Sequence, residues 1–156
     1  MHAEIVAIGT ELLLGKTVNT NASYLSKKLA SLGIDLFYQT TVGDNRTRLF
    51  TVLKRALHRS DIVITTGGLG PTVDDLTLEI IAQATQSKLI LNPTVLKEIR
   101  EHFHRRHIPM PKSNIRQALI PDRADQVLKN EVGTAPGLII PYEKKVLIAC
   151  PVCLKN

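Results

Sequence analysis

The residues best suited to ligand chemistry lie between Thr66 and Asp75, in the run Thr-Gly-Gly-Leu-Gly-Pro-Thr-Val-Asp-Asp. This run follows a short apolar segment, Asp61 to Thr65, that predicts a buried strand, and it opens a predicted helix from Asp74 to Thr85. Three glycines allow the backbone to approach a ligand closely and to adopt positive φ. The helix N-terminus behind them offers free N–H groups and a partial positive charge. The run therefore predicts a phosphate-binding loop, although it matches neither the Walker A motif nor the dinucleotide fingerprint.

Two adjacent acids, Asp74 and Asp75, stand at the predicted start of that helix. One of them could simply cap the helix, and a cap needs no ligand. Two carboxylates beside an anion site would repel the anion, and a bridging divalent cation would remove that conflict. The pair thus leaves two interpretations open, a cap and a metal ligand.

Two further polar loops follow predicted strands. Thr10 and Glu11 come after the strand from Ala3 to Gly9, and Asp44 comes after the strand from Ile34 to Val42. Ligands of parallel α/β sheets bind beyond the carboxyl ends of the strands, so we expect these loops and the Gly-rich loop to share one sheet edge. The alternative for each of the two loops is an ordinary turn that caps the next helix.

Alternating strands and helices predict one α/β domain with a mainly parallel sheet covered on both faces. Later in the chain, three short strands are expected to pair as hairpins. The remaining predicted elements are helices at Asn21 to Gly33, Arg46 to His58, Pro93 to His107 and Ile115 to Ile120, a linker at Ile108 to Lys112, and strands at Val127 to Lys129, Leu138 to Ile140 and Val146 to Ala149.

The composition narrows the class of protein. A length of 156 residues fits one domain. The net charge of +6 would permit an anionic partner, but the basic residues are scattered, aromatic residues make up 4%, and Trp is absent, which argues against nucleic acid. No run of 18 apolar residues and no signal peptide are recognisable, so we expect a cytoplasmic protein without a membrane partner. We also expect a homo-oligomer.

Two groups of potential metal or redox residues have simpler interpretations. Cys150 and Cys153 have dithiol spacing, but no helix follows that would lower a thiol pKa, and we expect a disordered tail. His102, His104 and His107 suggest a metal, but His102 and His104 do not share a helical face, so a solvated basic face is expected.

Five segments together resemble the N-terminal domain of the CinA (competence/damage-inducible) family. They are Gly-Thr-Glu-Leu-Leu-Leu-Gly, Val-Asn-Thr-Asn, Val-Gly-Asp-Asn, the Gly-rich run extended to Thr77, and Val-Gly-Thr-Ala-Pro-Gly from Val132 to Gly137. The resemblance covers about residues 3 to 148. That domain is similar to the molybdopterin-binding proteins MoaB and MogA, and the resemblance implies a three-layer α/β/α fold.

The resemblance also implies an activity and its residues. It implies an ADP-ribose pyrophosphatase that needs a divalent metal (Mg, Mn or Co) and yields AMP and ribose 5-phosphate, or a binding site for a phosphorylated pterin. Asp75 matches the family's ligand-holding Asp and is expected to bind the metal. Glu11 and Asp44 match the family's motifs, and we infer that one serves as catalytic base and one as second metal ligand, with Asp44 expected as the ligand. The expected ligand-binding residues are Thr10, Thr66, Gly67, Gly68, Gly70, Thr72 and Thr77.

The end of the chain departs from the family pattern. We expect the domain to span residues 1–149 and an atypical tail to span residues 150–156, without the family's C-terminal amidase domain. The family's Pro-Gly-x-Pro segment after the last strand is also missing. Besides the hydrolase, a non-catalytic ligand binder and an inactive fragment therefore remain open. We expect the tail to be dispensable for ligand binding.

Overall fold

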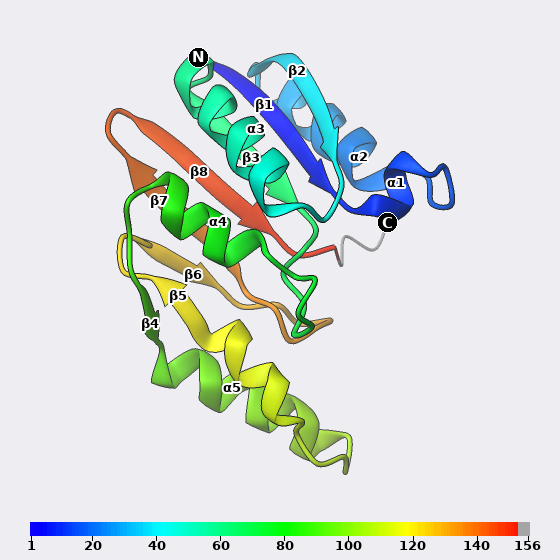
Figure 1. The fold of residues 1–156 in the computed structure, drawn as a ribbon, viewed down its shortest axis with the longest axis vertical. Coiled ribbons are helices and arrows are strands. Elements are labelled where there is room, and N and C mark those ends of the chain that lie inside the picture. Colours follow the sequence, from blue (N-terminus) through cyan, green and yellow to red (C-terminus); the bar gives the residue numbers. More distant parts are fainter. Residues whose placement is uncertain (153–156) are drawn as a thin grey trace.

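A six-stranded sheet forms the centre of the protein in the computed structural model, which describes residues 1–152 (Figure 1). Four neighbouring strands run parallel, and the last two are added by antiparallel pairing. From one edge to the other the strands are β2 (Asp35–Val42), β1 (His2–Ile8), β3 (Ile62–Thr66), β8 (Lys145–Cys150), β7 (Gly137–Tyr142) and β6 (Gln126–Leu128).

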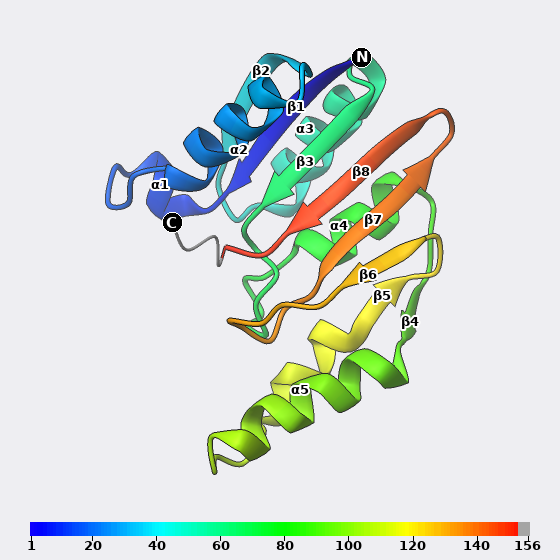
Figure 2. The same cartoon turned by 180° about the vertical axis from the view of Figure 1, so that it is seen from behind.

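Helices cover both faces of the sheet, which confirms the predicted α/β class and three-layer arrangement. α2 (Thr20–Ser31) lies on one face, and α3 (Arg46–Arg59) and α4 (Thr77–Ala84) lie on the other, as the two opposite views show (Figures 1 and 2). α2 buries Ala22 and Leu29 in a smaller cluster with the side chains of β1 and β3 on that face. The apolar face of each of these helices therefore packs against one face of the sheet.

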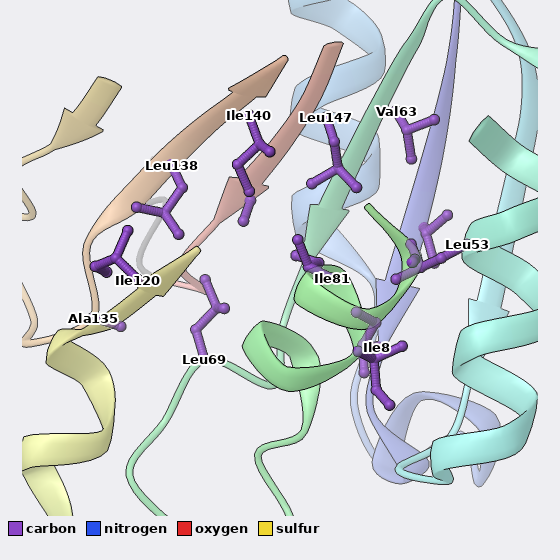
Figure 3. Packing of buried hydrophobic residues seen from close by; sticks show 14 of the residues in the cluster. Ile8, Leu53, Val63, Leu69, Ile81, Ile120, Ala135, Leu138, Ile140 and Leu147 are labelled. Carbon is purple, nitrogen blue, oxygen red and sulfur yellow. The ribbon is translucent and has the colours of Figure 1, made fainter. Parts of the chain in front are cut away.

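The larger core lies on the α3 and α4 face. Leu53, Ile81, Leu138, Ile140 and Leu147 are buried together there (Figure 3). The same cluster contains Leu69, from the Gly-rich loop between β3 and α4. The core therefore extends from the sheet to this loop.

One charged side chain is fully buried in the middle of β1. Glu4 is 0% exposed, and its carboxylate accepts hydrogen bonds from Arg59 at 2.9 and 2.8 Å, from Thr40 at 3.0 Å and from Ser60 at 3.3 Å. The Arg59 guanidinium also lies 3.5 Å from the centroid of the Tyr38 ring. These donors offset the cost of removing the carboxylate from water, and they tie β1, β2 and the end of α3 together.

A second lobe follows α4. It contains a small antiparallel sheet of β4 (Leu89–Leu91) and β5 (Leu119–Pro121), the helix α5 (Pro93–Arg105) and the 3₁₀ helix η1 (Lys112–Ala118). α5 buries Val95, Leu96 and Ile99 in the large core cluster, so the lobe is continuous with the domain. None of the helices in residues 1–152 has the length and apolar character needed to span a membrane.

Several predicted elements differ from the structure. α4 begins at Thr77 rather than Asp74, a short helix α1 (Thr10–Leu13) replaces the first polar loop, and η1 includes Lys112 from the predicted linker. β4 and β5 were not predicted, because three-residue strands carry too little periodicity to recognise. The predicted hairpins are confirmed, since β6 pairs with β7 and β7 pairs with β8.

Candidate functional site

The three polar loops meet at the carboxyl edge of the sheet, which confirms the expected convergence. Thr10 N donates to the Asp44 carboxylate at 2.9 Å, and Asp44 N donates to the Thr10 hydroxyl at 3.1 Å, so the first two loops bind each other directly. The Gly-rich loop joins them, because a Cβ on Gly67 would come within 2.1 Å of the Ile8 carbonyl oxygen at the end of β1. Glu11 is exposed on α1 beside the same edge.

The glycines of the third loop are required by the protein's own packing. Gly67 has φ +103° and Gly68 has φ +64°, in the region that favours glycine. A Cβ on Gly68 would lie 2.2 Å from the Thr77 hydroxyl. Thr77 is 0% exposed, and its hydroxyl donates to Gly67 O at 2.9 Å. The expectation that Thr77 contacts the ligand is therefore corrected, since its side chain is inside the protein and shapes the loop.

Asp75 organises the Gly-rich loop rather than the helix. Its carboxylate accepts from Gly70 N and Thr72 N, both at 2.9 Å, and from the Thr72 hydroxyl. The helix α4 begins two residues later, at Thr77, so neither Asp75 nor the exposed Asp74 is its N-cap. The interpretation of either acid as the N-cap of α4 is therefore wrong: Leu76 holds the N-cap position, and Asp75 accepts hydrogen bonds within the loop before the helix starts.

A hollow of about 350 Å³ opens between the Gly-rich loop and the loop that precedes β7. The second loop is folded by the Asn130 side chain, whose carbonyl oxygen accepts from Val132 N and Gly133 N at 3.0 Å and whose amide donates to Ala135 O at 2.9 Å. The lining is shared by both loops, η1 and the segment after β8: Gly68, Leu69, Gly70, Pro71, Asp75, Gln117, Asn130, Gly133, Thr134, Ala135, Pro151 and Val152. We call this space the larger hollow.

A smaller hollow of about 140 Å³ lies at the N-terminus of α2. Glu11, Thr66 and Asn21 line it, and the Asn21 amide donates to the Thr66 hydroxyl at 3.2 Å. Asn19 caps α2 by accepting from Ala22 N at 3.1 Å. Val152 lines this hollow and the larger one, so the two spaces are neighbours.

The segment after the last strand belongs to the site, which corrects the expected tail. Cys150 is the last residue of β8 and pairs with Thr66, so the domain extends beyond residue 149. Pro151 and Val152 line the larger hollow. The reason for calling the tail dispensable, its lack of packing, therefore fails for residues 150–152. Burial raises the pKa of the Cys150 thiol, which disfavours the thiolate. Cys153 lies outside the described residues.

The described residues do not bring a set of metal ligands together. Residues 1–152 contain no group of three or more His, Cys, Asp or Glu side chains that could hold an ion, and this includes the three histidines of the α5 region. His104 and His107 are exposed, as a solvated basic face predicts, whereas His102 is half-buried, and burial lowers the pKa of its imidazole. At Asp44 and Asp75, loop N–H groups already occupy part of each carboxylate.

Sequence reasoning missed the residues that connect the walls of the larger hollow. Leu69 is 5% exposed and anchors the Gly-rich loop in the main core (Figure 3). Gln117, on η1, and Asn130 shape the remaining walls. A polar residue such as Asn130 within a turn sequence is a local signal, but the position of Gln117 follows only from the packing of the second lobe.

Comparison with known proteins places this geometry in context. The family described as "Probable molybdopterin binding domain" matches residues 4–154. A CinA-like protein of Dictyoglomus turgidum is 52% identical over 97% of this chain and 36% of its own length, so the chain spans about a third of the curated relatives that it matches.

Solved structures agree with this similarity. The crystal structure of CinA from Thermoplasma acidophilum is 32% identical, with a TM-score of 0.89 over 97% of this chain and 88% of that one. The molybdopterin biosynthesis enzyme MoaB of Thermus thermophilus is 15% identical, with a TM-score of 0.63 over 96% and 80% of the two chains, which shows a shared fold.

Proposed function

The chain belongs to the molybdopterin-binding domain family, among the CinA proteins, and on this premise we propose that it binds a phosphorylated small molecule of the pterin or nucleotide type. One observation carries the proposal. The two hollows at the carboxyl edge lie side by side, the larger against the Gly-rich loop and the smaller at the N-terminus of α2, and Val152 lines both.

The chemistry of the walls suits such a ligand. Gly68 and Gly70 have no side chains, so the backbone of the Gly-rich loop lines the larger hollow just ahead of α4, and the N–H groups at a helix N-terminus attract phosphate. The Thr66 hydroxyl and the amide of Asn21 supply hydrogen bonds in the smaller hollow. A ligand with a phosphorylated part and a planar polar part would use both spaces.

Isothermal titration calorimetry of the pure protein with ADP-ribose, AMP and a phosphorylated pterin tests this function. Val152→Trp fills the boundary between the hollows and should weaken the ligand that binds by tenfold or more, about 1.4 kcal/mol. Val127→Trp, on β6, is the matched control and should bind as the parent does. If none of the three compounds binds, or if both variants bind equally, the hollows are not the site.

A second candidate is metal-dependent cleavage of ADP-ribose into AMP and ribose 5-phosphate. It is favoured by three carboxylates at the same sheet edge, those of Glu11 on α1 and of Asp44 and Asp75 on the loops. Asp75 lines the larger hollow and could give one carboxylate to a divalent cation, with phosphate oxygens and water as further ligands, a common arrangement for Mg²⁺. Such an ion, when bound, would neutralise the pyrophosphate and activate water.

In that reaction the protein's own groups would orient the ligand. Asp44 is held by Thr10, so its carboxylate has a fixed position, and Glu11 lines the smaller hollow, where it could accept a proton from water. Incubation with ADP-ribose and Mg²⁺, Mn²⁺ or Co²⁺, followed by phosphorus NMR, should show AMP and ribose 5-phosphate. If ADP-ribose binds but stays intact with all three metals, the protein binds the ligand without cleaving it.

A further inference from the structure

The 3₁₀ helix η1 contacts the Gly-rich loop through two consecutive side chains. Gln117 Nε2 donates to Leu69 O at 3.1 Å, and Arg116 Nη1 donates to Thr72 O at 2.9 Å. These two carbonyl groups lie on either side of Gly70 and Pro71, which line the larger hollow together with Leu69. η1 therefore contacts the part of the loop that faces the proposed ligand.

The Gln117 amide has one possible orientation. Leu69 O can only accept, so the amide nitrogen of Gln117 must face it. On the other side, Asn114 Nδ2 donates to Gln117 Oε1 at 2.9 Å. Gln117 and Asn114 are 2% and 4% exposed, so water does not compete for these bonds. The amide is thus held from both ends, and Gln117 is one of the residues that line the larger hollow.

Arg116 extends the contact to a second loop of the site. Its Nη2 donates to Glu79 at 2.9 Å, and the other oxygen of Glu79 accepts from Arg46. Arg46 is the first residue of α3 and follows the Asp44 loop directly. The Arg46, Glu79 and Arg116 side chains therefore connect the loop of Asp44, the helix α4 and the Gly-rich loop.

The first part of the loop, at Gly67 and Gly68, is held from below by Thr77, whose hydroxyl donates to Gly67 O and whose N–H donates to Gly68 O. The bonds from Gly70 and Thr72 to Asp75 close the loop on itself, and Leu69 fastens one point of it in the core. The bonds from η1 are the side-chain contacts that join the later part of the loop, from Leu69 to Thr72, to the second lobe, and η1 also lines the larger hollow through Gln117.

We propose that Arg116 and Gln117 are positioning residues, which hold the Gly-rich loop in its ligand-binding shape through Thr72 O and Leu69 O. The ligand part of this inference rests on the proposed function, whereas the positioning of the loop does not. Donors from a distant element on two carbonyls of one loop, three residues apart, are the kind of support that preorganises a binding loop.

Amide exchange measured by NMR tests the positioning without any ligand. In Arg116→Met, exchange at Gly70 N and Thr72 N should be tenfold or more faster, while Val6 N in β1 stays protected. Arg100→Met, an exposed arginine on α5, is the matched control and should change neither. Gln117→Met should give the same local effect. If it does not fold, Arg116→Met decides, and unchanged exchange at Gly70 and Thr72 overturns the proposal.

Ligand affinity gives the second measurement, with ADP-ribose and inorganic phosphate as probes. Arg116→Met should lose affinity for any probe that the parent binds, and Arg116→Lys, which keeps a donor and a positive charge, should recover part of it. If exchange at the loop is faster in Arg116→Met but the parent binds neither probe, the positioning is supported and the proposed function is rejected for these two ligands. Parent-like affinity in Arg116→Met would overturn the role in binding.

Discussion

Replacement of Asp75 by Asn removes an acceptor from the centre of the Gly-rich loop. In the native loop, one carboxylate oxygen accepts from Gly70 N and the other from Thr72 N and the Thr72 hydroxyl. The amide of Asn can accept on one side only. Its better orientation keeps both Thr72 donors and turns the NH₂ group toward Gly70 N, where two donors then face each other.

The size of the effect follows from that lost bond. A hydrogen bond to a charged acceptor contributes about 1.5–3 kcal/mol, and Asp75 is half-buried, so water replaces part of it. We expect Asp75→Asn to lower the free energy of unfolding by about 1–2 kcal/mol. In a chain of this size, each kcal/mol lowers the melting temperature by roughly 2–4 °C. The exposed neighbour offers a control, since Asp74→Asn should stay within about 0.5 kcal/mol of the parent.

Urea unfolding followed by circular dichroism measures both variants under the same conditions. Equal losses in Asp74→Asn and Asp75→Asn would refute the role of Asp75 in closing the loop. A parent-like free energy of unfolding in Asp75→Asn, combined with loss of ADP-ribose binding or turnover, would show instead that Asp75 acts on the ligand or its metal.

Three further predictions concern buried or paired polar groups. Thr65→Val should raise the free energy of unfolding by up to about 1 kcal/mol in urea, because the buried Thr65 hydroxyl has no hydrogen-bond partner within residues 1–152; a loss would show that the hydroxyl is satisfied. Glu4→Gln should lower it by about 2 kcal/mol, less than the loss for a fully buried pair because the arginine partner is partly exposed, and an unchanged urea midpoint would contradict this. The hydrogen bond from Arg46, and to a lesser extent that from Arg116, lowers the pKa of Glu79 below its ordinary value of 4.5. The ionised Glu79 should therefore stabilise the fold above pH 4.5, and this contribution should disappear as the pH falls through the folded-state pKa. The difference between parent and Glu79→Gln, at most about 1 kcal/mol for such an exposed group, should therefore vanish in acid, and a constant difference from pH 7 to pH 3 would disprove the coupling.

The sequence by itself determined the sheet edge that carries the site. Short apolar runs identified β1 and β3, and β-branched and aromatic residues identified β2. The rule for parallel sheets then brought the loops after these strands together. The sequence also indicated that glycines allow positive φ in the Gly-rich loop, and Gly67 and Gly68 adopt it. These features depend on neighbouring residues and on a rule common to the whole fold class, so they are readable without coordinates.

Only the tertiary structure decided what the loop residues contact. Thr77 turned inward to support Gly67, and Asp75 bonded within the loop, because the exact turn geometry selects one partner among several nearby groups. Gln117 reaches Leu69 across 48 residues of sequence, and Arg116 reaches Thr72 across 44. Such contacts depend on how the second lobe packs against the sheet, and hydrophobic periodicity describes each segment's own structure without specifying which distant segment it will meet.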